Sequence, residues 1–260
     1  MSNSAASLFI ITRVPKMKIV SWNINRASYV RKNFWKYFEK LNFDIGMFQE
    51  VYMIPYKIRK RYEVVRGEMN VILIKNNINA EIKRTNVLDT HSKNEVIADF
   101  CTSCEIELFG KTITLISIYN YIGPNKRDFS EFLQVLWKYI SINRNKIIII
   151  GGDFNMDEEF QGQLRGWGQL MKNLKEELST FGYKDVLSDG LNSKPYTFIT
   201  PANKRPYQLD YLFIPRNIKL VNAKVGNEDE IFNTKPRLSD HLPIIATVEI
   251  RENRIKQQKQ

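Results

Sequence analysis

Long hydrophobic runs are absent from the 260-residue sequence, and so are internal repeats and low-complexity linkers. No apolar stretch approaches the roughly 18 residues of a membrane-spanning helix, so we expect no membrane span. Hydrophobic residues make up 43% and charged residues 26%, which excludes a disordered chain, a collagen-like fibre and a coiled coil. We therefore predict a single domain over residues 17–250, between a poorly determined leader at 1–16 and a polar, basic tail at 251–260.

Cysteine is scarce, since Cys101 and Cys104 are the only two. A single C-x-x-C without a second pair is weak evidence for zinc or redox chemistry. Because the flanking segments 96–98 and 105–108 are strand-like, we interpret both cysteines as free thiols in a β-hairpin region. Reduced thiols suit a cytoplasmic or otherwise intracellular protein. The apolar run 5–11 has no basic residue before it, so it does not match a secretory signal.

Acidic residues are too few to balance the basic ones: 28 Asp and Glu face 39 Lys and Arg, a formal net charge of +11. A field of this sign attracts polyanions, so nucleic acid or an anionic membrane surface is a favoured partner. Charge alone does not decide the matter, because a solvated, lysine-rich surface has the same composition.

Hydrophobic periodicity predicts a few amphipathic helices among many strands. The helical positions are 34, 37, 38 and 41; 129, 132, 133, 136 and 140; and 170, 174, 178 and 181. The predicted strands are 18–23, 44–49, 62–66, 70–75, 104–109, 112–119, 147–150, 196–200, 207–214, 218–225 and 244–250. The all-isoleucine run 147–150 is typical of a strand buried on both faces. This pattern favours two packed sheets with helices outside, and it disfavours a Rossmann fold or a TIM barrel.

Polar residues that can support catalysis follow several of these strands, where a rigid scaffold usually presents a site. They are Asn23, Glu50, Asp153, Asn155, Asp210, Asp240 and His241. Asp210 lies inside an apolar strand, which is costly for a carboxylate without a partner. Oxygen ligands without cysteine favour Mg²⁺ or Mn²⁺ over zinc, and such a site suits hydrolysis of phosphate esters. Each residue alone is equally compatible with a turn or loop; the combination carries the interpretation.

Five short motifs occur in a characteristic order: Ser21-Trp22-Asn23, Gln49-Glu50, Gly152-Asp153-Phe154-Asn155, Leu209-Asp210-Tyr211 and Ser239-Asp240-His241. In this series the sequence resembles the endonuclease/exonuclease/phosphatase superfamily over roughly residues 17–250. The resemblance implies an α/β fold, a four-layered α/β sandwich of two packed, mainly antiparallel β-sheets flanked by helices.

The resemblance also implies a role for each residue. Glu50 would be the main Mg²⁺ ligand, with Asp240 and Asn23 nearby. Asp153 would orient or deprotonate the attacking water, and Asn155 would bind that water or the phosphate. His241 would donate to a phosphate oxygen, with Asp210 behind it fixing the imidazole tautomer.

Most of the lipid, deadenylase and pancreatic-deoxyribonuclease branches of the superfamily carry a second active-site histidine in a pattern like Thr-His-Leu, which this sequence lacks. At the matching strand end it has Tyr119, which resembles the abasic-site endonuclease and non-LTR retrotransposon endonuclease branches. Tyr121 is the alternative if the register differs by two residues, and His91 falls in a predicted loop at 89–93. The segments 195–198 and 238–241 also resemble the retrotransposon pattern. The stretch between Asp153 and Asp210 is shorter than in dedicated abasic-site enzymes, which argues against abasic-site specificity.

Basic residues cluster beside these motifs: Lys57, Arg59, Lys60 and Arg61; Lys126 and Arg127; Lys204 and Arg205. We predict that they line one rim and hold a phosphate backbone, the alternative being ordinary solvated loops.

The sequence therefore predicts a monomeric, Mg²⁺- or Mn²⁺-dependent nuclease that cuts DNA, as an endonuclease or exonuclease in a repair-related role. The alternative is a phosphatase or phosphodiesterase for phospholipid or other small phosphorylated substrates. A catalytically silent nucleic-acid-binding module is disfavoured because every motif residue is present.

Overall fold

The computed structural model describes residues 15–28, 30–88, 100–121, 126–188, 195–201 and 203–250, without the side chains of 126–128. The predicted tail, most of the predicted leader, His91 and the side chains of Lys126 and Arg127 therefore lie outside the described residues. Within them, no helix is both long enough and apolar enough to span a membrane.

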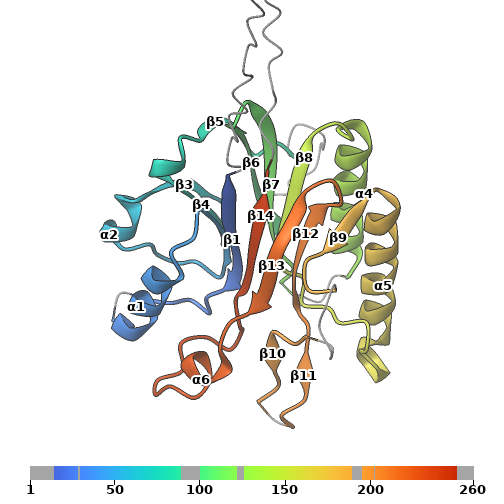
Figure 1. Ribbon diagram of the computed structural model, residues 1–260. Coiled ribbons are helices and arrows are strands. Elements are labelled where there is room, and N and C mark those ends of the chain that lie inside the picture. Colours follow the sequence, from blue (N-terminus) through green and yellow to red (C-terminus); the bar gives the residue numbers. More distant parts are fainter. Residues whose placement is uncertain are drawn as a thin grey trace, which may run out of the picture.

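Two six-stranded sheets form the centre of the molecule (Figure 1). The first has the order β13(Lys219–Val225)-β14(Ile244–Glu249)-β1(Lys16–Asn23)-β2(Ile45–Gln49)-β4(Asn70–Lys75)-β3(Tyr62–Arg66). The second has the order β5(Glu81–Thr85)-β6(Cys101–Leu108)-β7(Lys111–Tyr119)-β8(Ile147–Asp153)-β12(Asp210–Pro215)-β9(Tyr183–Asp185). Each sheet has one parallel pair at its centre, β1–β2 and β7–β8, and the other pairs are antiparallel. The sheets are thus mixed, and mainly antiparallel as predicted.

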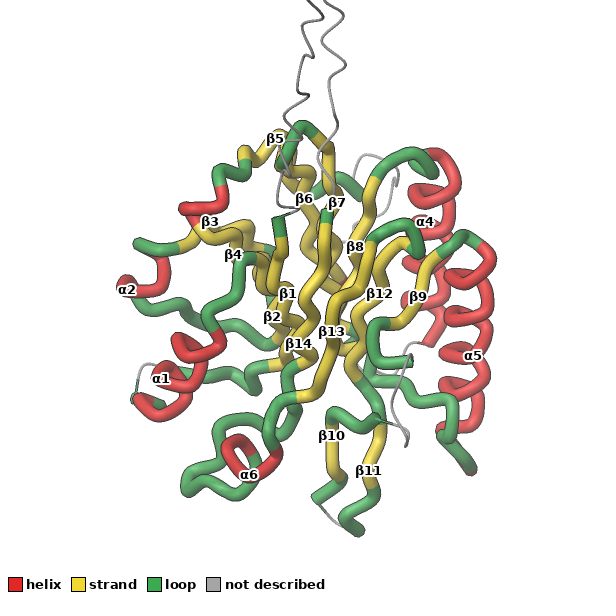
Figure 2. Tube along the Cα trace, in the orientation of Figure 1, coloured by secondary structure: helices red, strands yellow, loops and turns green. Residues whose placement is uncertain are grey.

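Helices cover the two outer faces of this pair of sheets (Figure 2). On one side lie α1(Lys32–Leu41) and the short α2(Tyr56–Arg59), and on the other lie α4(Lys126–Ile142) and α5(Arg165–Thr180). The parallel pairs arise because α1 and α4 each connect two neighbouring strands, as parallel pairing requires. The remaining short elements are η1(Asn76–Ile78), η3(Gly162–Leu164), α6(Glu228–Ile231) and a hairpin of β10(Phe198–Ile199) and β11(Pro206–Tyr207). The predicted four-layered α/β sandwich is confirmed.

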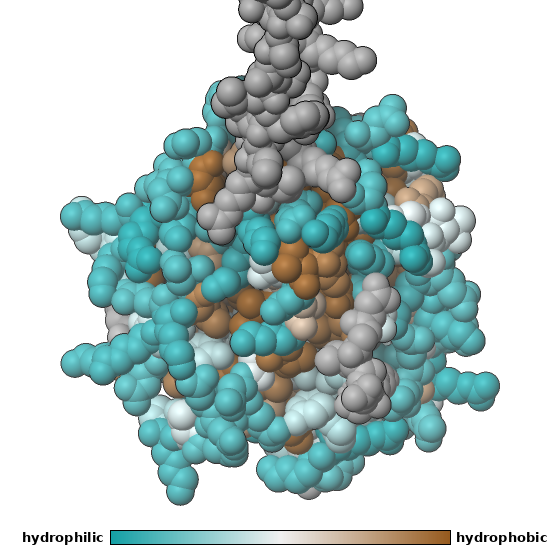
Figure 3. Space-filling view, viewed as in Figure 1, coloured by the Kyte–Doolittle hydropathy of each residue, from teal (hydrophilic) through white to brown (hydrophobic). Residues whose placement is uncertain are grey.

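Three apolar cores separate the four layers, and alternation along the strands creates them. In β8, Ile147 and Ile149 point into the core between the sheets, whereas Ile148 and Ile150 point into the core under α4 and α5. The same alternation places Cys101 and Cys104 on opposite faces of β6, in different cores. Neither cysteine forms a disulfide, as predicted. Apolar side chains show along the middle of one face, between hydrophilic flanks (Figure 3).

Several element boundaries differ from the predicted ones. The predicted helix through Phe181 ends at Thr180, and Phe181 instead stacks on Trp137 of α4 at 5.9 Å. The predicted strand 207–214 is divided, because the backbone N–H groups of Leu209 and Asp210 bond the Thr197 hydroxyl and not a neighbouring strand. The edge strands β5 and β9 were not predicted, since one is largely polar and the other has three residues.

Candidate active site

The strands bring the predicted residues to one end of the sandwich. In the parallel pair β1–β2, Asn23 lies opposite Gln49, so Asn23 and Glu50 leave the sheet side by side. In the second sheet Tyr119 lies opposite Asp153, and Asp153 lies opposite Asp210 at the start of β12. His241 is joined to Phe198 of β10 by a β-bridge, so this end is the one from which the β10–β11 hairpin projects (Figure 1).

Asp153 is fully buried and lies at the centre of a hydrogen-bond network. Its Oδ2 accepts from Asn23 Nδ2 at 2.9 Å and from Asn155 Nδ2 at 3.2 Å, and its Oδ1 accepts from the Asn155 backbone N–H at 2.8 Å. Asn155 adopts a left-handed backbone, φ 50°, which turns its side chain back onto Asp153. Burial, opposed by the charge of His241 and reinforced by that of Asp210, raises the pKa of Asp153 to about 7.

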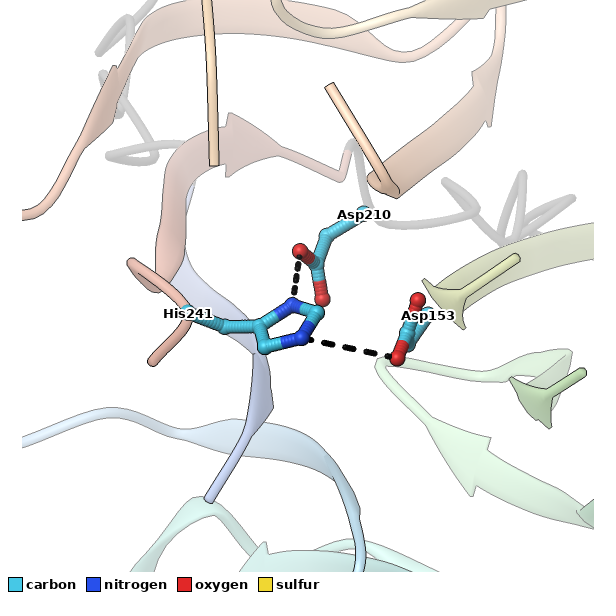
Figure 4. Close-up of side chains that lie close together, drawn as sticks. All are labelled: Asp153, Asp210 and His241. Atoms are coloured by element: carbon cyan, nitrogen blue, oxygen red, sulfur yellow. Dashed lines mark hydrogen bonds and ion pairs between the residues drawn. The ribbon is translucent and has the colours of Figure 1, made fainter. Parts of the chain in front are cut away.

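The His241 imidazole lies between two aspartates (Figure 4). Its Nδ1 is 2.7 Å from Asp210 Oδ2, and its Nε2 is 3.9 Å from Asp153 Oδ2. Burial alone would lower the pKa of His241, but the charges of Asp210, Asp153 and, last in order, Asp240 raise it to about 10. The neighbouring carboxylates thus favour the protonated, cationic form of the ring. Its Nε2 proton has no good acceptor at 3.9 Å, which leaves it for a substrate oxygen.

Glu50 also has a left-handed backbone, φ 54°, and only part of its side chain, 18%, is exposed. Its Oε1 accepts from Asn23 Nδ2 at 3.1 Å and from the Tyr119 hydroxyl at 2.9 Å. Its Oε2 forms an ion pair with Arg26 Nε at 3.3 Å. Burial, together with the charge of Glu50, raises the pKa of Tyr119, so this hydroxyl is a hydrogen-bond donor. Tyr119 thus contacts Glu50 directly, whereas the Tyr121 side chain is 63% exposed.

The profile of the Endonuclease/Exonuclease/phosphatase family matches residues 20–241, most of the chain and all of the residues above. The chain belongs to this family. Membership identifies it as a hydrolase that acts on phosphate ester bonds. Comparison with curated proteins gives no match.

Solved structures with this fold include several enzymes of the family. The endonuclease/exonuclease/phosphatase from Bacteroides vulgatus is 16% identical, with 91% of this chain and 100% of that chain covered and a TM-score of 0.66. TDP2 from D. rerio, complexed with a single-strand DNA product, is 15% identical, with 90% and 99% covered and a TM-score of 0.65. An AP endonuclease from Archaeoglobus fulgidus is 19% identical, with 88% and 98% covered and a TM-score of 0.64. These likenesses show the shared fold.

The family is metal-dependent, and the donor set of this chain fits a hard divalent cation, because its carboxylate and amide groups are the ligand types of Mg²⁺ and Mn²⁺. Glu50 is the partly exposed carboxylate, whereas the side chains of Asp153 and Asp210 are 0% exposed. Asp153, Asp210 and His241 offer ligand atoms within 4.8 Å of one another. Asp210 Oδ1 is buried with no hydrogen-bond partner among the described residues.

The orientation of Asn23 differs from the predicted ligand role. Its amide nitrogen faces Glu50 and Asp153, and its oxygen accepts from the Asn25 backbone N–H at 2.9 Å. In this structure the Asn23 side chain is therefore a donor that holds two carboxylates together. Asp240 directly precedes His241 in the chain. Burial lowers the pKa of both His241 and Arg31, and the negative charge of Asp240 acts in the opposite direction on each.

The predicted basic rim is only partly brought together. The carbonyl groups of Lys60 and Arg61 bond Asn76, which follows the last residue of β4. Glu50, in contrast, follows Gln49, which pairs with Asn70, the first residue of β4. Lys60 and Arg61 thus leave the backbone at the opposite end of β4 from the site, and the prediction that they share its rim is wrong.

The other predicted basic residues are divided in the same way. Lys57 of α2 pairs with Glu39 of α1 at 3.0 Å, and Arg59 lies over the Tyr56 ring at 6.0 Å. Lys204 and Arg205 lie in the β10–β11 hairpin, at the active-site end. Lys204 and Arg205 therefore lie on the hairpin that projects from the active-site end, whereas Lys57 and Arg59 lie on α2.

Two residues near the site were not predicted. Arg26 pairs with Glu50, and the Thr197 hydroxyl holds the backbone at the start of β12. Thr197 lies in the segment 195–198, whose resemblance to the retrotransposon pattern could have indicated that this residue lies near the site. Arg26 has no such signal, because its contact with Glu50 depends on the neighbouring strand.

Proposed function

We propose that this protein is a Mg²⁺-dependent phosphodiesterase that hydrolyses DNA by in-line attack of water. The observation that carries the proposal is a continuous network across the two sheets. Asn23 joins Glu50 to Asp153, and Asp153 faces Nε2 of the imidazolium that Asp210 holds. A base, a cationic donor and a cation-binding carboxylate are thus aligned along one path, as phosphodiester hydrolysis requires.

Within this proposal each side chain has a chemical task. Asp153 orients the attacking water and accepts its proton, held in place by Asn23 and Asn155. The Nε2–H of His241 donates to a non-bridging phosphate oxygen as negative charge develops there. Glu50 and Asp240 would hold the cation, which when bound supplies charge neutralisation at the phosphate. Tyr119 keeps Glu50 in position through the 2.9 Å hydrogen bond.

DNA is proposed as the substrate on the net charge of +11 and on the basic hairpin residues Lys204 and Arg205. Two of the structures with this fold are an AP endonuclease and a TDP2 complex with a single-strand DNA product. The proposal covers both an endonuclease and an exonuclease, in a repair-related role. We further propose a monomer in a reducing, intracellular compartment, since one chain supplies the site and the two cysteines form no disulfide.

One assay tests the proposal. Purified protein is incubated with supercoiled plasmid, an abasic duplex, single-stranded DNA, RNA and a phosphoinositide, with Mg²⁺, with Mn²⁺ and with EDTA. We expect cleavage of DNA that EDTA abolishes and that Mg²⁺ or Mn²⁺ restores. Cleavage in a thoroughly chelated sample would refute the metal dependence, and hydrolysis of the phosphoinositide alone would replace the proposed substrate.

A further inference from the structure

Two exposed tyrosines flank Glu50. Tyr52 is 55% exposed and follows Glu50 by two positions, and Tyr121 is 63% exposed and follows Tyr119 by two positions. Large aromatic rings that remain in water beside a site provide area for a ligand to cover.

Tyr52 is connected to one oxygen of Glu50. The Arg26 guanidinium lies 5.5 Å from the centre of the Tyr52 ring, and its Nε is 3.3 Å from Glu50 Oε2. The carbonyl of Tyr52 also accepts from the Arg66 side chain at 2.9 Å. Arg66 thus holds the backbone of Tyr52, and the positively charged Arg26 side chain covers one face of the Tyr52 ring.

Tyr121 is connected to the other oxygen. Its ring centre is 6.3 Å from that of Tyr119, whose hydroxyl donates to Glu50 Oε1 at 2.9 Å. The two carboxylate oxygens of Glu50 therefore lead to two separate exposed rings, with Arg26 between Glu50 and one of them.

We propose that Tyr52 and Tyr121 stack unpaired nucleobases next to the phosphate being cut, while Arg26 supplies positive charge to the backbone there. This inference rests on the proposed function and specifies its substrate as single-stranded or locally unpaired nucleic acid. Stacking on an aromatic ring needs a base whose face is free, which a base inside a duplex does not offer. Every base has such a face, so this binding tolerates any sequence.

Tyr56 provides a matched control within the same chain. It is 64% exposed, and Lys60 Nζ lies 4.6 Å from its ring centre, so it resembles Tyr52 in residue type, exposure and neighbouring charge. It begins α2, however, and the residue over its ring, Lys60, leaves the backbone at the end of β4 away from Glu50. A general affinity of tyrosines for nucleic acid would involve Tyr56 equally.

The test is equilibrium binding of the inactive Asp153→Asn protein to fluorescent oligonucleotides of one length. The ligands are single-stranded DNA, single-stranded RNA, duplex DNA and a DNA strand whose bases are all replaced by abasic sites. Tyr52→Leu and Tyr121→Leu should each weaken binding of at least one of the two base-carrying single strands about five- to hundredfold. Binding of the abasic strand should change by less than about twofold, because its phosphates remain and its stacking partners are gone.

The DNA and RNA arms identify which strand is recognised, and a loss on either supports the proposal. Equal losses on the abasic strand, or an equal loss in Tyr56→Leu, would overturn it. So would unchanged binding of both base-carrying single strands in Tyr52→Leu or in Tyr121→Leu. Hydrolysis of bis(p-nitrophenyl) phosphate by the unmodified protein is measured separately. Its failure would count against the proposed function while the binding comparison remained valid.

Discussion

At the residue scale, the contact between Asp210 and His241 explains a carboxylate in an apolar strand. The 2.7 Å bond between His241 Nδ1 and Asp210 Oδ2 holds the ring in place and turns Nε2 toward Asp153. A buried carboxylate and imidazole stabilise each other's charged forms, whereas either one alone would be left uncompensated. The two side chains should therefore act as a unit in catalysis.

This coupling predicts a non-additive double substitution. His241→Ala should lower turnover by at least about a hundredfold, since it removes the donor to the phosphate. Asp210→Asn should lower it less, because the imidazole remains but is poorly oriented. The combined variant should lose little more than His241→Ala alone, as measured by kcat per folded molecule.

Stability has to be followed beside turnover, because His241→Ala leaves Asp210 buried without its partner and should lower Tm as well. Glu105→Gln, which alters a buried carboxylate in the middle of β6, is the control for that effect. It should reduce Tm while leaving kcat per folded molecule unchanged. Fully additive losses in the double variant would show that Asp210 does not act through His241.

Tyr119 allows a second prediction at this scale. Tyr119→Phe removes the 2.9 Å hydrogen bond to Glu50 and leaves the ring in place. Loss of one hydrogen bond to a charged group should reduce kcat about ten- to hundredfold and raise the Mg²⁺ concentration for half-maximal activity. Tyr121→Phe removes only an exposed hydroxyl and should have a far smaller effect. Equal effects of the two changes would contradict the placement of Tyr119 in the site.

At the element scale, an ion-pair network around the buried Glu105 joins β6 to β5, to α4 and to the start of β8. Glu105 is 6% exposed and contacts Lys146 Nζ at 2.5 Å, Arg84 Nε at 3.4 Å and the Tyr139 hydroxyl at 3.3 Å. Burial alone would raise the pKa of Glu105, but Lys146 and Arg84 together lower it below the ordinary glutamate value. A folded-state pKa below the unfolded value makes this carboxylate stabilising at neutral pH.

Glu105→Gln should therefore reduce the free energy of unfolding at pH 7 by about 1–3 kcal/mol. The contribution of the ionised carboxylate is present above the unfolded pKa and is lost as the pH falls through the lower folded pKa. The difference between Glu105→Gln and the unmodified protein should thus shrink below about pH 4 in urea unfolding curves. Glu63→Gln, at an exposed position of β3, is the matched control and should change the free energy of unfolding by less than about 0.5 kcal/mol.

At the scale of the whole molecule, only some of the basic residues lie where they could contact a phosphate backbone bound at the active site. The net charge of +11 acts at long range, but only basic residues at the active-site end can contact a phosphate backbone bound there. Lys204 and Arg205 are at that end, whereas the backbone of Lys60 and Arg61 bonds Asn76 at the opposite end of β4.

Salt titrations of DNA binding should separate these two pairs. Each phosphate contact contributes about 0.9 to the log–log slope of affinity against salt. Replacing both Lys204 and Arg205 by Ala should lower the slope by about 1–2 and weaken binding. Replacing both Lys60 and Arg61 by Ala removes the same charge and should leave the slope close to that of the unmodified protein. If the two double variants behave alike, long-range charge and not contact governs binding.

Local patterns in the sequence determined much of this molecule. The alternating strands, the amphipathic helices and the strand at 147–150 that is buried on both faces were all predictable. They depend on side chains a few residues apart, whose spacing is set by the helix or strand itself. For the same reason the separation of Cys101 and Cys104 onto opposite faces follows from their odd spacing in a strand.

Only the tertiary structure decided which strand ends meet and what each side chain faces there. The register of β7 against β8 selected Tyr119 over Tyr121, and the path of the chain through α2 carried Lys60 and Arg61 away from Glu50. The contact of Arg26 with Glu50 and the turn of Asn23 toward both carboxylates likewise join different strands. Such contacts depend on how two sheets pack and align, and no spacing within one segment encodes that alignment.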